Sequence, residues 1–69
     1  MTTTMITREE CLTLKTDRER AAAIPKMSVY DWDIVADWES ETEDKDYKDA
    51  FHCASRSMYH RMELKEGIL

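Results

Sequence analysis

The sequence predicts an all-α protein with three helices, two short ones followed by one long C-terminal helix around a small single core. The chain of 69 residues contains one glycine and one proline, so most of it is expected to be regular structure joined by short turns. In its last third, apolar side chains recur at spacings of four, three, four and four, which places them on one face of a helix. These residues are Tyr47, Phe51, Ala54, Met58 and Met62.

Length and composition predict one soluble domain, residues 1–69. Hydrophobic residues make up 42% and charged residues 36% of the chain, which is typical of a folded domain. A chain of this size buries only about 60% of the surface that its unfolded form exposes, so its core is small. No apolar run is long enough to span a membrane, and no secretory leader pattern is seen, so a cytoplasmic location is expected. Cys11 and Cys53 are therefore expected to be buried thiols.

The first helix is predicted from Arg8 to about Ala23. Thr7 and Glu10 have the spacing of a capping box, in which each side chain accepts a hydrogen bond from the other residue's backbone amide. The six residues before Thr7 show no periodicity and are expected to be frayed, although Ile6 could pack on Cys11. Pro25 ends the helix, because it moves the preceding residue out of helical geometry. The apolar face of this helix is thin, so we expect it to be only partly covered.

Residues 28–38 have a pattern that is compatible with either a strand or a helix. Tyr30, Trp32, Ile34, Ala36 and Trp38 alternate with other, mainly acidic residues, which is the pattern of a half-buried strand. A helix is favoured, because Ser28 begins a second capping pattern and no other segment offers a strand partner. The helix would be apolar on two sides, so it would either touch two neighbours or leave an aromatic patch exposed.

Residues 39–46 are the predicted connection, in which Ser40 and Thr42 could each cap the helix that follows. The long helix is then expected within residues 42–69. Gly67 suits the left-handed conformation that often ends a helix, and Ile68 could fold back on Met62. Phe51 lies in the middle of the apolar stripe, so it is expected to be the most costly position of this helix to truncate.

The sequence carries no pattern that favours an enzyme, a metal site or a cofactor site. His52 and His60 lie about 12 Å apart along one helix, too far to share an ion, and are expected to be surface residues. A Cys/His pair is formally present, but it lacks an orienting third residue and an oxyanion pocket. A chain with one glycine cannot form a glycine-rich phosphate loop.

Acidic residues concentrate between Asp31 and Asp49. This segment contains nine carboxylates and two lysines, a net charge of −7, whereas the rest of the chain has six acidic and eight basic residues. Direct nucleic-acid binding is disfavoured, because the basic residues form no contiguous patch. The segment is either a solubilising surface or a docking surface for a basic partner.

Two aromatic residues, Trp38 and Tyr59, lie off the main apolar stripes and are expected to be exposed. Trp and Tyr are enriched among the residues that dominate protein interfaces. The candidate interaction residues are therefore these two aromatics and four acids of the acidic segment: Trp38, Tyr59, Asp31, Asp33, Asp37 and Glu41.

The whole chain resembles the small, acidic, helical accessory proteins encoded in the early region of lambda-like phages, between the recombination and excision genes. The resemblance is carried by residues 5–10 (MITREE), by residues 30–33 (YDWD) and by residues 51–53 (FHC). It contains no catalytic motif and transfers no functional residue. It implies a non-enzymatic role in redirecting the host cell or the lysis–lysogeny choice through a protein partner.

Two functions follow as hypotheses. The first is a protein-interaction module that binds a host or phage protein, or a second copy of itself as a homodimer. The alternative is an acidic mimic of nucleic acid that occupies the basic cleft of a DNA-binding protein. The mimic requires the carboxylates from Asp31 to Asp49 to form one contiguous face.

Overall fold

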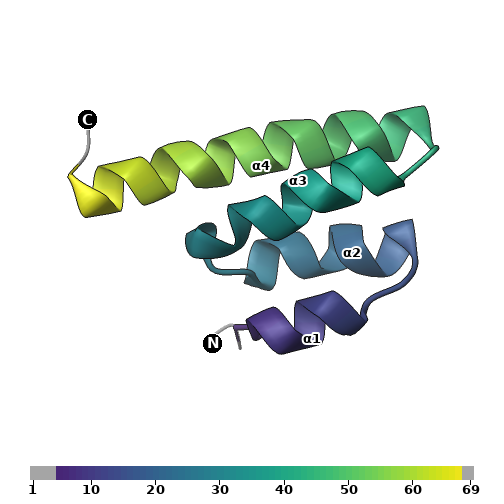
Figure 1. Ribbon diagram of the computed structural model, residues 1–69, viewed down its shortest axis with the longest axis horizontal. Coiled ribbons are helices and arrows are strands. Elements are labelled where there is room, and N and C mark those ends of the chain that lie inside the picture. Colours follow the sequence, from purple (N-terminus) through teal and green to yellow (C-terminus); the bar gives the residue numbers. More distant parts are fainter. Residues whose placement is uncertain (1–4, 68–69) are drawn as a thin grey trace.

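The computed structural model describes residues 5–67, and its four α-helices confirm the all-α fold class. They are α1 (Arg8–Thr13), α2 (Asp17–Ala23), α3 (Trp32–Glu41) and α4 (Lys45–Glu66), with short 3-10 turns at Ile24–Lys26 and Val29–Asp31. No β-strand occurs within residues 5–67. Helices α3 and α4 form an antiparallel hairpin, and α1 and α2 lie on the opposite side of α3 from α4 in the view of Figure 1.

The predicted single helix from Arg8 to Ala23 is wrong, because the structure divides it into α1 and α2. The capping box of Thr7 and Glu10 begins α1 as expected, but Leu14 is extended and ends it. Thr16 then caps α2, and its side-chain oxygen accepts a hydrogen bond from the Glu19 amide at 3.2 Å. The chain bends here because Thr16 and Glu19 repeat the spacing of a helix start.

The helical reading of residues 28–38 is confirmed. The Ser28 side chain accepts a hydrogen bond from the Tyr30 amide and begins a 3-10 turn, after which α3 continues to Glu41. The predicted connection is therefore shorter, residues 42–44. Ser40 lies inside α3, and the cap of α4 is Asp44, which accepts hydrogen bonds from the amides of Asp46 and Tyr47. A carboxylate at this position also complements the partial positive charge of a helix N-terminus.

Helix α4 presents the predicted stripe to the core. Phe51 and Met58 are buried, and Tyr47, Ala54 and Met62 are half-buried. Gly67 ends the helix in the left-handed region at φ +69°, as expected. The predicted contact of Ile68 with Met62 lies outside the described residues.

One hydrophobic core connects the helices. Its buried members come from α1, α3, α4 and the segment after α2: Cys11, Met27, Ile34, Val35, Trp38, Phe51 and Met58. The Phe51 ring lies between two aromatic neighbours, with centroid distances of 5.9 Å to Trp38 and 6.0 Å to Tyr47. Burial of so large a set of side chains is the main source of stability in a domain of this size.

Trp38 was expected to be exposed, and this prediction is wrong. Only 2% of its surface is accessible, because it packs against Phe51 in the core and the Arg20 guanidinium of α2 lies over the indole ring, 5.5 Å from its centroid. Such a cation over an aromatic face is attracted by the negative charge density of the ring. The Arg20 side chain also donates a hydrogen bond from its Nε atom to the Leu14 carbonyl oxygen, which connects the two short N-terminal helices.

Two smaller expectations also fail. Cys53 is exposed, because it lies on the side of α4 opposite the core, whereas Cys11 is buried as predicted. Of the six residues expected to be frayed, residues 1–4 lie outside the described part. Ile6 is held in place, since its amide donates a hydrogen bond to the Lys26 carbonyl oxygen at 2.9 Å and its side chain packs on the core.

In the described part of the chain, no helix is long and apolar enough to cross a membrane.

Candidate protein-interaction surface

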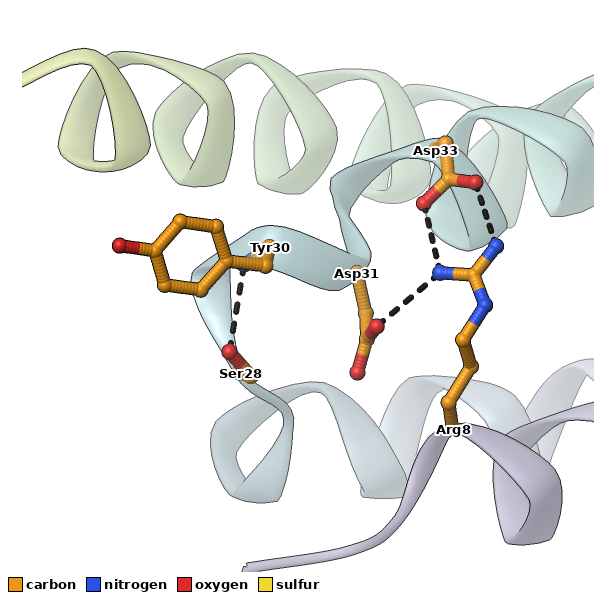
Figure 2. Close-up of polar contacts among 5 residues, drawn as sticks. All are labelled: Arg8, Ser28, Tyr30, Asp31 and Asp33. Atoms are coloured by element: carbon orange, nitrogen blue, oxygen red, sulfur yellow. Dashed lines mark hydrogen bonds and ion pairs between the residues drawn. The ribbon is translucent and has the colours of Figure 1, made fainter. Parts of the chain in front are cut away.

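Two of the predicted interaction residues, Asp31 and Asp33, bind Arg8 of the same chain. Figure 2 shows the Arg8 guanidinium of α1 extended between the two carboxylates at the start of α3. Its Nη1 donates to Asp31 Oδ1 at 3.1 Å and to Asp33 Oδ1 at 3.1 Å, and its Nη2 donates to Asp33 Oδ2 at 2.7 Å. The Asp33 contact is therefore bidentate, the geometry in which Arg–carboxylate pairs are most specific.

The electrostatics of this cluster favour a structural role. Hydrogen bonds from Arg8 hold the pKa of Asp33 below its ordinary value, and the two carboxylates raise the pKa of Arg8. The Asp31 side chain is also largely buried. A carboxylate that is already paired and partly desolvated is poorly placed to meet a partner, so Asp31 and Asp33 connect α1 to α3 instead.

Other carboxylates of the acidic segment are used within the chain as well. Glu41 lies 3.5 Å from Arg20, the Glu39 carboxylate lies 3.2 Å from the Nδ1 atom of His52, and Asp44 caps α4. Asp37 is exposed and forms no ion pair with any residue between positions 5 and 67. Of the four predicted acidic residues, Asp31, Asp33 and Glu41 are therefore paired within the chain, and Asp37 is not.

A groove between α3 and α4 is the better candidate surface. Its volume is about 460 Å³, and six residues line it, two from α3 and four from α4: Trp32, Ala36, Ser55, Arg56, Tyr59 and His60. We call it the α3–α4 groove. Tyr59, which was expected to be exposed, lies in this groove with 39% of its surface accessible.

Two of the residues that line the groove, Ala36 of α3 and Ser55 of α4, have small side chains. The Ser55 hydroxyl donates to the His52 carbonyl oxygen at 3.0 Å. That hydroxyl therefore needs no further partner. Trp32 and Tyr59 also line the groove, with ring centroids 4.8 Å apart and an interplanar angle of 77°. This edge-to-face contact is a preferred geometry for aromatic pairs and holds both rings in place.

Two residues that line the groove, Arg56 and His60, belong to a longer line of basic residues along α4. Positions 48, 52, 56 and 60 are spaced four apart and follow one line along α4; we call them the cationic row: Lys48, His52, Arg56 and His60. Glu39 engages the first two of them, since its carbonyl oxygen accepts from Lys48 Nζ at 2.9 Å and its carboxylate faces His52.

The second half of the cationic row consists of Arg56 and His60. The Nδ1 atom of His60 is 3.9 Å from the Glu63 carboxylate, and Arg56 forms no ion pair within residues 5–67. Of the two residues of the row that line the groove, Arg56 is therefore the one without a carboxylate partner in the described part of the chain.

Sequence reasoning missed Trp32, Arg56 and His60 as members of a common surface. Trp32 and Arg56 were not among the candidate interaction residues, and His60 was expected only to be a surface residue. The four-residue spacing of the cationic row could have been read from the sequence. The sequence does not show which side of α4 remains uncovered by α3.

A second, smaller groove of about 370 Å³ lies on the other side of α3. Leu12 borders it with 65% of its surface exposed, and its other lining residues include Arg20, Asp37, Trp38 and Glu41. Here the Arg20 side chain covers the indole and also lies near the Glu41 carboxylate, so the chain itself occupies much of the polar surface.

Metal-ligating side chains do not converge in the part of the chain that the structure describes. No group of three His, Cys, Asp or Glu residues within positions 5–67 has a geometry that could hold an ion.

Comparisons of the chain with protein-family models, with curated proteins and with solved structures give no match. The candidate site therefore rests on the geometry of the α3–α4 groove.

Proposed function

We propose that this protein is a non-enzymatic interaction module that binds another protein through the α3–α4 groove. The observation that carries the proposal is the Trp32–Tyr59 pair, which lines the groove together with the small residues Ala36 and Ser55 and remains partly open to solvent. Exposed aromatic surface in a concave site is typical of protein-binding surfaces, where a buried aromatic contact can supply much of the affinity.

The surrounding residues support binding rather than catalysis. The groove contains one cation, one imidazole, one phenol and a hydroxyl that already donates to backbone, and no nucleophile with an adjacent oriented base. It is also a surface groove between two helices, the kind of site in which an amphipathic segment of a partner can lie.

The resemblance to early accessory proteins of lambda-like phages extends this proposal to a biological setting. In that setting the partner is a host or phage protein of the bacterial cytoplasm, and binding alters host physiology or the lysis–lysogeny choice. The acidic mimic of nucleic acid is the weaker alternative, because Arg8, Arg20 and His52 already engage four carboxylates of the acidic segment.

A selection from a library of displayed random peptides tests the proposal. The immobilised protein is the target, and the Tyr59→Ala variant is used to remove peptides that bind elsewhere. We expect enriched peptides that bind the parent and lose most of their affinity for Tyr59→Ala. Leu64→Ala is the matched control, since Leu64 is 69% exposed on the same helix and does not line the groove.

The result that would overturn the proposal is equally specific. Peptides that bind the parent and Tyr59→Ala equally well, with both proteins folded by circular dichroism, would place the binding surface elsewhere. Failure to enrich any peptide would also count against an interaction module. Quenching of Trp32 fluorescence by an enriched peptide, absent in Trp32→Phe, would place the peptide in the groove.

A further inference from the structure

We propose that the occupant of the α3–α4 groove is an acidic segment of another protein that carries a bulky apolar side chain beside its carboxylates. This inference rests on the proposed function and specifies the chemistry of the partner. It is drawn from the charges that border the groove, which differ in sign from the net charge of −5 of the whole chain.

The first observation is the composition of the lining. Of the six lining residues, Arg56 and His60 are the only titratable bases, and no carboxylate is among them. Glu63, the acidic residue nearest in sequence to His60, does not line the groove, although its carboxylate lies 3.9 Å from the Nδ1 atom of His60. The one permanently charged side chain of the lining is therefore that of Arg56, which is positive.

The second observation concerns what Arg56 lacks. Arg8 and Arg20 both face carboxylates of their own chain, whereas Arg56, Arg18 and Arg61 face none within residues 5–67, and of these three only Arg56 lines the groove. A guanidinium presents several donors in a planar fork that matches a carboxylate, so the natural complement of Arg56 is an Asp or Glu side chain.

The third observation is the shape of the site. The lining combines the small residues Ala36 and Ser55 with two aromatic rings in contact with each other, so an apolar side chain of the partner would fit against Trp32 and Tyr59. Successive members of the cationic row are about 6 Å apart along α4, because each residue of a helix adds 1.5 Å. Carboxylates one helical turn apart in the partner have a similar spacing.

The negative charge elsewhere on the chain does not prevent this contact. Exposed charges separated by more than about 8 Å are largely screened at physiological ionic strength. Three carboxylates of the acidic segment are also paired with arginines of the same chain, Asp31 and Asp33 with Arg8 and Glu41 with Arg20. Nucleic acid is the less suitable anion, because the groove holds one arginine, whereas phosphate backbones require several cations in register.

The experiment uses three synthetic peptides of equal length and the intact protein. The first peptide carries leucine and tryptophan on one helical face with glutamates beside them. The second replaces the glutamates with lysines, and the third replaces the apolar residues with serines. We expect saturable binding of the first peptide only, measured by fluorescence anisotropy, and a thymidine oligonucleotide should not bind.

Two charge-reversal variants of α4 localise the effect. Arg56→Glu should lower the affinity for the acidic peptide by about fivefold or more, because it replaces an attraction between unlike charges with a repulsion between like charges. Arg61→Glu makes the same change at an exposed position about 140° around the helix, and should leave the affinity nearly unchanged. Equal effects of the two variants would overturn the inference, since they would indicate a response to net charge alone.

The outcomes also separate this inference from the proposed function. If the lysine peptide binds as well as the glutamate peptide, and both lose affinity for Tyr59→Ala, the groove remains a protein-binding site but its preference for acidic partners is wrong. If sedimentation shows a dimer that Tyr59→Ala dissociates, the occupant is a second copy of the chain and the inference also fails. If no peptide responds to Tyr59→Ala, both proposals fail.

Discussion

The guanidinium of Arg8 and the carboxylate of Asp33 form a two-bonded ion pair that connects the first helix to the third, with distances of 2.7 and 3.1 Å. The two residues are 25 positions apart in sequence, so the pair forms only when the chain is folded. It is therefore an internal contact of the fold at a place where the acidic sequence suggested a binding surface.

This pair predicts a specific dependence of stability on acid. Because Arg8 lowers the pKa of Asp33, the folded state binds the Asp33 proton more weakly than the unfolded chain does. The contribution of the pair is fully present above the unfolded pKa, with an ordinary value of 3.8, and is lost as the pH falls through the lower folded pKa. Asp33→Asn should therefore lower the melting temperature near neutral pH and flatten its decline between about pH 5 and about pH 2.

The measurement is a series of circular dichroism melts across this pH range, with Asp37→Asn as the matched control. Asp37 is on the same helix, is exposed and has no ion-pair partner within residues 5–67. If the two variants show the same pH dependence, the Arg8–Asp33 pair contributes nothing measurable to stability.

Truncation of Phe51 should be the most damaging single change in α4. Phe51 is fully buried between Trp38 and Tyr47, and replacing a buried phenylalanine with alanine costs about 3–5 kcal/mol. A core of this size supplies about 3–5 kcal/mol in total, so Phe51→Ala should be largely unfolded at room temperature. Ser57→Ala, at an exposed position of the same helix, should melt like the parent. A folded Phe51→Ala protein would contradict the packing described above.

Thr16 is predicted to stabilise the break between α1 and α2. Its hydroxyl oxygen accepts a hydrogen bond from the Glu19 amide, and loss of such a helix cap lowers stability by about 0.5–2 kcal/mol. Thr16→Ala should therefore lower the free energy of unfolding by about 1 kcal/mol, whereas Thr16→Ser should keep most of it. Urea denaturation compares the three proteins. An unchanged Thr16→Ala protein would mean that α2 needs no side-chain cap.

Gly67 offers a test of backbone strain without a packing effect. A side chain at this position would have no atom within 4 Å, yet the backbone has φ +69°, which an L-residue adopts at a cost of about 1–2 kcal/mol. Gly67→Ala should fray the last turn of α4, and Gly67→Asn should be better tolerated. Amide hydrogen exchange of the last turn detects the difference. Equal protection in all three proteins would exclude a role for the glycine in ending the helix.

The two cysteines should differ in reactivity. Cys53 is exposed, whereas Cys11 is fully buried, and burial raises the pKa of the Cys11 thiol and so disfavours its reactive thiolate. A thiol reagent should therefore modify one cysteine per native molecule rapidly and the second only as the protein unfolds. Mass spectrometry of the labelled peptides identifies each site, and Cys53→Ser should abolish the rapid reaction. Rapid labelling of Cys11 would show that α1 opens easily.

Much of the secondary structure could be predicted because the information is local. The capping box at Thr7, the left-handed turn at Gly67 and the buried position of Phe51 each follow from residues within one or two turns. The break at Thr16 was equally local, since Thr16 and Glu19 have the same spacing as Thr7 and Glu10. It was missed because a continuous helix up to Pro25 also explained the residues.

The sequence by itself determined the fold class, the long C-terminal helix and the face that this helix buries, because a single apolar stripe leaves one way to pack it. The tertiary structure alone decided which aromatic residues of α3 are covered. That helix is apolar on two sides. Trp38 packs against Phe51 in the core and lies under the Arg20 side chain, whereas Trp32 lines the open groove between α3 and α4. Periodicity places residues on a face, but only the neighbouring helices determine which face remains accessible to a partner.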